Sequence, residues 1–280
     1  MSIFLDSELT ASERSDDARF RVIPVPLERT VSYGSGTAKG PEAIIEASNE
    51  LERITGHAEP CVEGIFTEAE LDCDAALPEI MERLAQRTEA AVRAGKIPVV
   101  LGGEHSLSYG SIMGVARALG QPIGIVQIDA HADLRNAYQG EKHSHASVMH
   151  LLAEEGVRLA QFGVRAISTE EAKSRLKNHV FHVDAEELVT GNIHAVDLPE
   201  DFPESVYVSF DVDGLDPSLM PATGTPVPGG LGYYQALRLV EHALKGRKCV
   251  GFDVVELAPD GNAAWDFTAA QIVYRLMAAC

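Results

Sequence analysis

Short, almost continuously apolar runs of strand length recur along the chain and constrain its fold more than any other feature. Seven such runs are visible, at residues 20–24, 97–101, 123–128, 159–163, 180–183, 206–210 and 249–255. Strands that are apolar on both faces are typical of parallel sheets covered by helices. Segments with helical character separate the runs, at residues 41–53, 76–94, 108–119, 146–155, 170–176, 232–244 and 267–278. This alternation predicts an α/β fold with a mainly parallel central sheet.

The sequence predicts one domain spanning residues 1–280. A chain of this length has a prior of one or two domains, and no linker rich in Pro, Gly or Ser and no internal repeat divides it. Its longest irregular segments, at residues 137–145 and 213–232, both follow predicted strands. Open α/β folds place their sites in loops beyond the carboxyl ends of strands. We therefore expect one site at one edge of the sheet.

Charge excludes some classes of partner. Acidic residues number 42 and basic residues 23, which gives a net charge of −19. Nucleic acids and anionic membranes need clustered Lys and Arg, so we expect neither as a partner. The charge is compatible with a cationic small molecule, although the charge alone favours solubility as its explanation. With no visible signal peptide and no apolar run of about 20 residues, the chain is expected to be cytoplasmic.

The four cysteines are scattered, and none forms a Cys-x-x-Cys pair. Cys249 lies in an apolar run and is expected to be a buried thiol. A disulfide between Cys61 and Cys73 is formally possible, but a cytoplasmic protein would keep both thiols reduced.

Carboxylate and imidazole side chains directly follow three of the apolar runs. In extended backbone, residues two positions apart project to the same face, and the sequence has Asp-x-His-x-Asp after one run and Asp-x-Asp after another. A further His follows Gly-Gly-Glu after the third run. The six potential ligands are His105, Asp129, His131, Asp133, Asp211 and Asp213.

These side chains predict a metal centre. Carboxylates packed this closely raise one another's pKa values, a cost that cations between them remove. A single Asp-x-Asp is more often a turn, but three such blocks at strand ends are hard to explain as turns or as surface. Mixed carboxylate and imidazole ligands without thiolate suit Mn²⁺, with Zn²⁺, Fe²⁺ or Co²⁺ as alternatives. Six ligands are more than one ion needs, so two ions are expected.

The same blocks resemble the three signature blocks of the ureohydrolase (arginase/agmatinase) family. They are Gly-Gly-Glu-His-Ser at 102–106, Asp-Ala-His-Ala-Asp at 129–133 and Ser-Phe-Asp-Val-Asp-Gly-Leu-Asp-Pro at 209–217, and the match continues at 221–226 and 251–256. The resemblance runs from about residue 24 to the C-terminus. It implies a three-layer α/β/α fold, two Mn²⁺ per chain held by the six residues named above, hydrolysis of a guanidino compound to urea and an amine, and a homo-oligomer, trimer or hexamer.

The resemblance also implies roles for other residues. His145 matches the family's loop histidine that transfers a proton to the departing amine, with His143 as the competing choice. Glu256 matches the carboxylate that pairs with the substrate guanidinium. Asp133 would orient the attacking hydroxide, and Thr225 is expected to contact the substrate together with His145 and Glu256.

Within the family, the sequence looks most like agmatinases, on residues 27–37 and on Asp133-Leu134-Arg135. Arginases carry Asn at the position of Arg135, and acidic residues after a Gly-Leu-Arg stretch that here reads Gly-Val-Arg-Ala-Ile-Ser at 163–168. Both departures argue against L-arginine and favour agmatine, cleaved to urea and putrescine.

Three other functions stay open: a hydrolase of guanidino acids, a non-catalytic metal-binding protein and a metal-dependent deacetylase. Arg135 could attract the carboxylate of 4-guanidinobutanoate or 3-guanidinopropanoate, or it could pair with an acidic residue of the chain. A non-catalytic metal-binding pseudoenzyme would be expected to lack a ligand, and none of the six is missing. A metal-dependent deacetylase usually has a single catalytic zinc, whereas the second Asp-x-Asp and the Gly-Gly-Glu-His block favour two ions.

Overall fold

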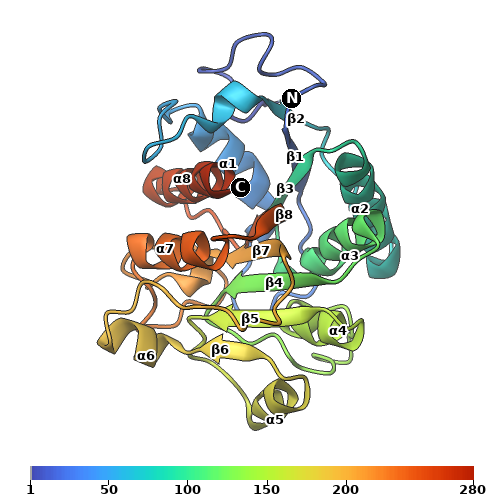
Figure 1. Cartoon of the computed structure of the whole chain (residues 1–280), viewed down its shortest axis with the longest axis vertical. Coiled ribbons are helices and arrows are strands. Elements are labelled where there is room, and N and C mark those ends of the chain that lie inside the picture. Colours follow the sequence, from blue (N-terminus) through green and yellow to red (C-terminus); the bar gives the residue numbers. More distant parts are fainter. Residues whose placement is uncertain (1) are drawn as a thin grey trace.

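A computed structural model describes residues 2–280 and contains one eight-stranded sheet whose paired strands all run parallel (Figure 1). The order of strands across the sheet is β2-β1-β3-β8-β7-β4-β5-β6. The strands are β1 (Phe20–Val25), β2 (Ile65–Thr67), β3 (Ile97–Gly102), β4 (Ile123–Ile128), β5 (Arg158–Phe162), β6 (Phe181–Val183), β7 (Ser205–Asp211) and β8 (Lys248–Val255). The prediction of a parallel α/β sheet is confirmed.

Helices cover both faces of this sheet. They are α1 (Gly40–Ser48), α2 (Leu77–Arg93), α3 (Ser108–Leu119), α4 (Val148–Glu154), α5 (Thr169–Lys177), α6 (Ala185–Thr190), α7 (Tyr233–Ala243) and α8 (Ala263–Ala279). Helices α1, α7 and α8 lie on one face and α2, α3 and α4 on the other (Figure 1), which gives the three layers expected. Apolar side chains of the strands and helices fill the space between the sheet and the helices on each of its faces. None of the helices described is long and apolar enough to span a lipid bilayer.

Some predicted boundaries are wrong, and two elements were not predicted. Residues 49–53 lie outside α1, which ends at Ser48. Helix α8 begins before residue 267, because the Asn262 side chain accepts a hydrogen bond from the backbone N–H of Ala264 and caps a helix that starts at Ala263. Strand β2 and helix α6 span three and six residues. These lengths are too short for a periodic pattern to be recognised.

Four central strands, β3, β8, β7 and β4, carry the predicted site blocks at their carboxyl ends. Their register aligns one row of residues across the sheet: Leu101, Val254, Phe210 and Ile128. The polar residues that follow this row therefore emerge at the same edge. Strands β7 and β8 lie between β3 and β4 although they come last in the chain. Such reversals of strand order form the crevices in which open α/β sheets place their sites.

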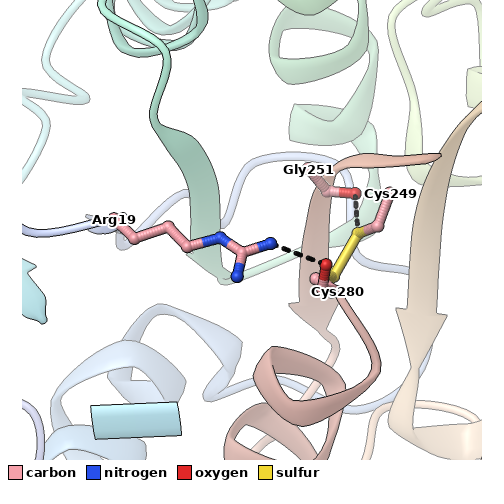
Figure 2. The surroundings of a disulfide bond; sticks show 4 residues. All are labelled: Arg19, Cys249, Gly251 and Cys280. Atoms are coloured by element: carbon pink, nitrogen blue, oxygen red, sulfur yellow. Dashed lines mark hydrogen bonds between the residues drawn. A yellow bond between two sulfur atoms is a disulfide. The ribbon is translucent and has the colours of Figure 1, made fainter. Parts of the chain in front are cut away.

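The structure corrects the expectation for Cys249. Cys249 forms a disulfide with Cys280, and this bond joins the start of β8 to the end of α8 (Figure 2). The two cysteines are 31 residues apart in sequence, so their pairing depends on α8 returning to the sheet, which no local pattern indicates. Arg19 Nη2 donates a hydrogen bond to the backbone oxygen of Cys280 (2.8 Å, Figure 2). Cys61 and Cys73 are free, as expected.

Candidate metal centre and active site

The six predicted ligands meet at the carboxyl edge of the four central strands. Their ligand atoms form two groups, and within each group the atoms lie no more than 4.8 Å apart. One group is His105, Asp129 and Asp211, and the other is Asp129, His131 and Asp213. Asp129 belongs to both groups, so its carboxylate would help to hold both ions. Asp133 lies outside these groups but close to the first.

The His105 side chain is buried and faces carboxylates. Its Nδ1 lies 3.1 Å from Asp129 Oδ2, 2.9 Å from Asp133 Oδ2 and 3.5 Å from Asp211 Oδ2. Nevertheless Nδ1 has no hydrogen-bond partner among residues 2–280. A buried polar atom without a partner is costly, and a cation between this nitrogen and the carboxylate oxygens would satisfy all of them.

The other nitrogen of His105 fixes the tautomer. Nε2 lies 2.8 Å from Ser209 Oγ, and Ser209 donates its hydroxyl proton to Asp253 Oδ1 at 2.8 Å. The Ser209 oxygen can then only accept from His105, so Nε2 carries the imidazole proton in the neutral ring. This leaves the lone pair on Nδ1, toward the carboxylates. A metal-binding histidine held by its second nitrogen has this arrangement.

The pKa values show that the cluster holds protons when no metal is bound. Burial, followed by the charges of Asp213 and Asp129, raises the pKa of Asp211 well above its usual range. Burial and the Asp129 charge raise the pKa of Asp133 to about 7. Burial alone would lower the pKa of His131, but hydrogen bonds with Asp129 and Asp213 outweigh it and raise this pKa to about 11. Protons thus supply the positive charge in the metal-free chain, and metal binding would displace them.

The backbone is strained at two of the predicted site residues. Asp133 and Glu256 have φ values of 52° and 66°, in the left-handed region that non-glycine residues rarely adopt. The Asp133 carbonyl accepts hydrogen bonds from the backbone N–H groups of Met149 and His150, both 3.1 Å, so the start of α4 holds this conformation. The Glu256 N–H donates to the Gly103 carbonyl at 2.8 Å. Strain kept in place by such contacts is common at functional sites.

His145 lies beside the centre on a loop that Thr30 anchors. The Thr30 hydroxyl donates to Glu104 Oε1 (2.8 Å) and accepts from the His145 backbone N–H (3.0 Å). His145 Nδ1 is 3.2 Å from the same hydroxyl, so it carries the ring proton and leaves Nε2 free. Burial lowers the pKa of His145 and favours this neutral form. His143 instead packs edge-on against the Tyr109 ring, with centroids 5.6 Å apart.

A cavity of about 330 Å³ opens onto the cluster. Its lining includes His131, Asp133, Arg135, Tyr138, His145, Ser168, Glu171 and Thr225. Glu256 is not among the lining residues. Its buried carboxylate accepts a hydrogen bond from the His105 N–H (2.6 Å), and burial raises its pKa. Thus His145 and Thr225 line the cavity, whereas Glu256 lies next to the His105 backbone and outside the cavity lining.

Arg135 lines the cavity and is paired. Its Nη2 lies 3.7 Å from Glu171 Oε2, and its guanidinium lies over the Tyr138 ring, 5.5 Å from the centroid. Glu171 is buried, and its carboxylate also accepts from the Ser168 hydroxyl (2.7 Å) in the capping box at the start of α5. The cavity wall therefore contains both members of an ion pair, and the positive charge of Arg135 is balanced there.

Comparison with known proteins matches this fold and site to one family. The family model described as "Arginase family" matches residues 18–279. The chain belongs to the arginase family. It is 40% identical over 269 residues to an N(1)-aminopropylagmatine ureohydrolase of Thermus thermophilus, covering 93% of this chain and 89% of the relative. It is 37% identical over 271 residues to an agmatinase of Pyrococcus horikoshii, covering 93% of this chain and 92% of the relative.

Solved structures agree with this membership. The crystal structure of the agmatine ureohydrolase of Thermoplasma volcanium superposes with a TM-score of 0.86 at 28% identity, covering 100% of this chain and 94% of that one. The resemblance drawn from the signature blocks is confirmed, and so is the arginase-like three-layer fold. This arginase-family chain is accordingly a ureohydrolase of the agmatinase type.

Several residues at this arginase-family site were not predicted. Gln127 and Ser209 stand two positions before Asp129 and Asp211 and therefore project to the same edge. Both are polar residues within otherwise apolar runs, and this exception to the pattern could have revealed them. The Ser168-x-x-Glu171 capping pattern could have indicated Glu171. Thr30 gave no such signal, because its contact with His145 joins residues 115 positions apart.

Proposed function

We propose that this chain is a binuclear manganese hydrolase that cleaves the guanidino group of agmatine to urea and putrescine. The observation that carries the proposal is the pair of ligand groups sharing the Asp129 carboxylate. The donor set contains carboxylate oxygens and imidazole nitrogens but no thiolate, which suits Mn²⁺ better than soft metals. His105, Asp129, His131, Asp133, Asp211 and Asp213 would hold the two ions.

The chain's own residues would perform the remaining steps. Two bound ions would supply a hydroxide nucleophile at neutral pH. Asp133 Oδ2 would accept a hydrogen bond from the nucleophile and orient it. His145 Nε2, free because Thr30 holds Nδ1, would take up a proton and return it to the departing amine nitrogen. Glu256 would neutralise the planar guanidinium, and Thr225 would contact the substrate from the cavity wall.

A second candidate substrate is N(1)-aminopropylagmatine. Three similar relatives, 35–40% identical to this chain, carry that substrate in their names. Both candidates have a cationic tail. Because Glu171 balances the charge of Arg135, the cavity wall does not present an unpaired cation that would repel such a tail. The guanidino acids 4-guanidinobutanoate and 3-guanidinopropanoate would need Arg135 to leave Glu171, and L-arginine is disfavoured for the same reason.

Urea release tests the proposal. Purified chain loaded with Mn²⁺ should be assayed on agmatine, N(1)-aminopropylagmatine, L-arginine and the two guanidino acids, with metal content measured in the same preparation. We expect about two Mn²⁺ per chain and turnover of a cationic amine, with agmatine first. Higher kcat/KM on N(1)-aminopropylagmatine would select the second candidate. Turnover of guanidino acids alone would overturn the substrate class, and about one Zn²⁺ without urea would overturn the binuclear hydrolase.

Other expectations from the family resemblance also belong to this proposal. We infer that residues 1–280 act as one domain, which the single continuous sheet supports, and that the protein is a homo-oligomer of three or six chains. We also infer that it is cytoplasmic, a compartment in which the Cys249–Cys280 disulfide would have to resist reduction. Light scattering after gel filtration measures the number of chains, and a monomer at assay concentration would contradict the oligomer.

A further inference from the structure

A buried chain of hydrogen bonds connects an ion pair at the protein surface to the shared ligand Asp129. Arg175 Nη1 contacts both carboxylate oxygens of Asp184, at 2.9 and 3.2 Å, and Arg175 Nε donates to Gln161 Oε1 at 2.9 Å. Gln161 Nε2 donates to Gln127 Oε1, and Gln127 Nε2 donates to Asp129 Oδ2, each at 2.7 Å. Apart from Asp184, these residues are all at least 96% buried.

Arg175 determines which way both amides point. A guanidinium can only donate, so the oxygen of Gln161 must face it and the nitrogen of Gln161 must face away. That nitrogen donates to Gln127 and to the Ala132 carbonyl, which uses both of its hydrogens. The Gln127 oxygen is then the acceptor, and the Gln127 nitrogen must point at Asp129. The direction of donation is therefore fixed along the whole chain of contacts.

This series of hydrogen bonds ends at the carboxylate of Asp129, which belongs to both ligand groups. Asp129 Oδ2 accepts from Gln127, and Asp129 Oδ1 accepts from the His131 backbone N–H at 2.6 Å. Two donors on two oxygens fix the plane of the carboxylate. The remaining lone pairs then face the atoms of both groups. Hydrogen bonds in series polarise one another, so the Arg175 charge strengthens the bond to Asp129.

We propose that Gln127 is a positioning residue for Asp129, and that Gln161 and Arg175 lock its orientation, so that these three residues set the affinity of the centre for divalent cations. The inference rests on the proposed function, because it requires a metal centre at Asp129. Hydrogen-bonded partners of metal ligands typically change metal affinity by about 10–100-fold when they are replaced. Gln127→Met, which keeps the length of the side chain but removes its donor, should weaken Mn²⁺ binding within that range.

The chain offers a matched control. Gln235 in α7 is also buried, and its Nε2 donates to the carbonyls of Leu188 and Ile193, both at 2.8 Å, with no link to the site. Gln235→Met therefore removes a buried amide of the same kind elsewhere in the fold. Both variants should lower the Tm of the metal-free chain, but only Gln127→Met should weaken Mn²⁺ binding.

Calorimetric titration of the metal-free full chain with MnCl₂ is the experiment, with wild type and both variants compared. Arg175→Lys, which keeps the charge next to Asp184 but loses the donor to Gln161, should weaken binding several-fold and carries the test if Gln127→Met does not fold. Wild-type affinity in the folded variants would overturn the positioning role and leave the proposed function intact. An equal loss of affinity in Gln235→Met would also overturn it. A wild-type chain that binds no Mn²⁺ would instead overturn the proposed centre, and the inference with it.

Discussion

At the scale of single residues, the carboxylates of the predicted ligands destabilise the metal-free fold, and bound cations would remove this cost. Burial and the charges of Asp213 and Asp129 raise the pKa of Asp211 above its value in an unfolded chain. A carboxyl group with a raised pKa in the folded state opposes folding at pH values where it would otherwise ionise. Asp211→Asn should therefore leave the metal-free chain at least as stable as wild type at pH 7, while abolishing urea release and the rise in Tm that Mn²⁺ produces.

Thermal unfolding in EDTA and in MnCl₂ measures both effects. Asp197→Asn is a suitable control, because Asp197 is 95% exposed and pairs only with His242. It should keep both the activity and the increase in Tm. If Mn²⁺ stabilises Asp211→Asn as much as wild type, Asp211 is not a ligand.

Replacing His145 should lower kcat without changing the number of Mn²⁺ ions bound. Removing a proton-transfer group typically costs about 10²–10⁴-fold in rate, so His145→Ala should lose kcat in that range while still binding two Mn²⁺. His143→Ala is the matched control. Because His143 packs against Tyr109 and is not among the cavity-lining residues, this variant should keep kcat within about twofold of wild type. The reverse result, from urea assays combined with metal analysis, would assign proton transfer to His143.

The same scale explains which site residues a sequence can predict. Five of the six predicted ligands were recognisable because they follow apolar strands with period-two spacing, which fixes the face to which they project. His105 was recognisable because it follows Gly-Gly-Glu after a third apolar strand. Arg135 was recognisable as a cavity residue, but its partner was not. Glu171 reaches Arg135 from the first turn of another element, and only the packing of α5 brings the two together. Side chains that meet through tertiary packing leave no local pattern.

At the scale of elements, the central strands were predictable from the sequence, whereas the edge strand β2 and the short helix α6 were not. Strands β4 and β7 are buried along their whole length, so their sequences are mostly apolar. Strand β2 is an edge strand of three residues that pairs only with β1. Its formation depends on that neighbour more than on its own composition, as expected for β-structure. The same dependence on tertiary contacts explains the short helix α6, whose Leu188 is buried against the core.

The loop at residues 213–232 depends on Asp216. Its carboxylate accepts from the Ser218 hydroxyl (2.6 Å) and from the backbone N–H groups of Gly229 (2.9 Å) and Gly230 (3.0 Å). These hydrogen bonds, that of the Ser218 hydroxyl first, lower the pKa of Asp216 from 3.8 to about 2. A depressed pKa means that this stabilisation is complete above pH 3.8 and disappears as the pH falls through about 2.

Asp216→Asn should therefore reduce the free energy of unfolding at pH 7 by about 1 kcal/mol, after discounting for the solvent exposure of the loop. The difference from wild type should be roughly halved by pH 3. Urea unfolding at several pH values measures it. A difference that stays constant from pH 7 to pH 3 would show that the Asp216 charge does not hold the loop.

At the scale of the whole molecule, the predicted metal centre and the disulfide lie at opposite ends of the sheet's strands. Strand β8 connects the two ends, with Cys249 near its start and Glu256 just beyond its finish. At about 3.3 Å per residue these positions are roughly 23 Å apart. The predicted ligands follow the carboxyl ends of the central strands, whereas the Cys249–Cys280 disulfide lies at the amino end of β8. The excess of 19 acidic charges is not concentrated at the site, because only a few of the 42 acidic residues lie there, among them the four predicted ligand aspartates, Glu171 and Glu256.

Removing the disulfide should consequently change stability without changing chemistry. The bridge closes a loop with a sequence separation of 31, and loops of this length typically stabilise a fold by about 2–4 kcal/mol. Cys280→Ser should lower the free energy of unfolding by that amount, while kcat and Mn²⁺ affinity stay at wild-type values. Cys73→Ser, at a free and half-buried thiol, is the control and should change neither. Urea unfolding with and without a reducing agent gives the measurement: reduction should bring wild type to the stability of Cys280→Ser, and a loss of Mn²⁺ affinity on reduction would show that the two edges of the sheet are coupled.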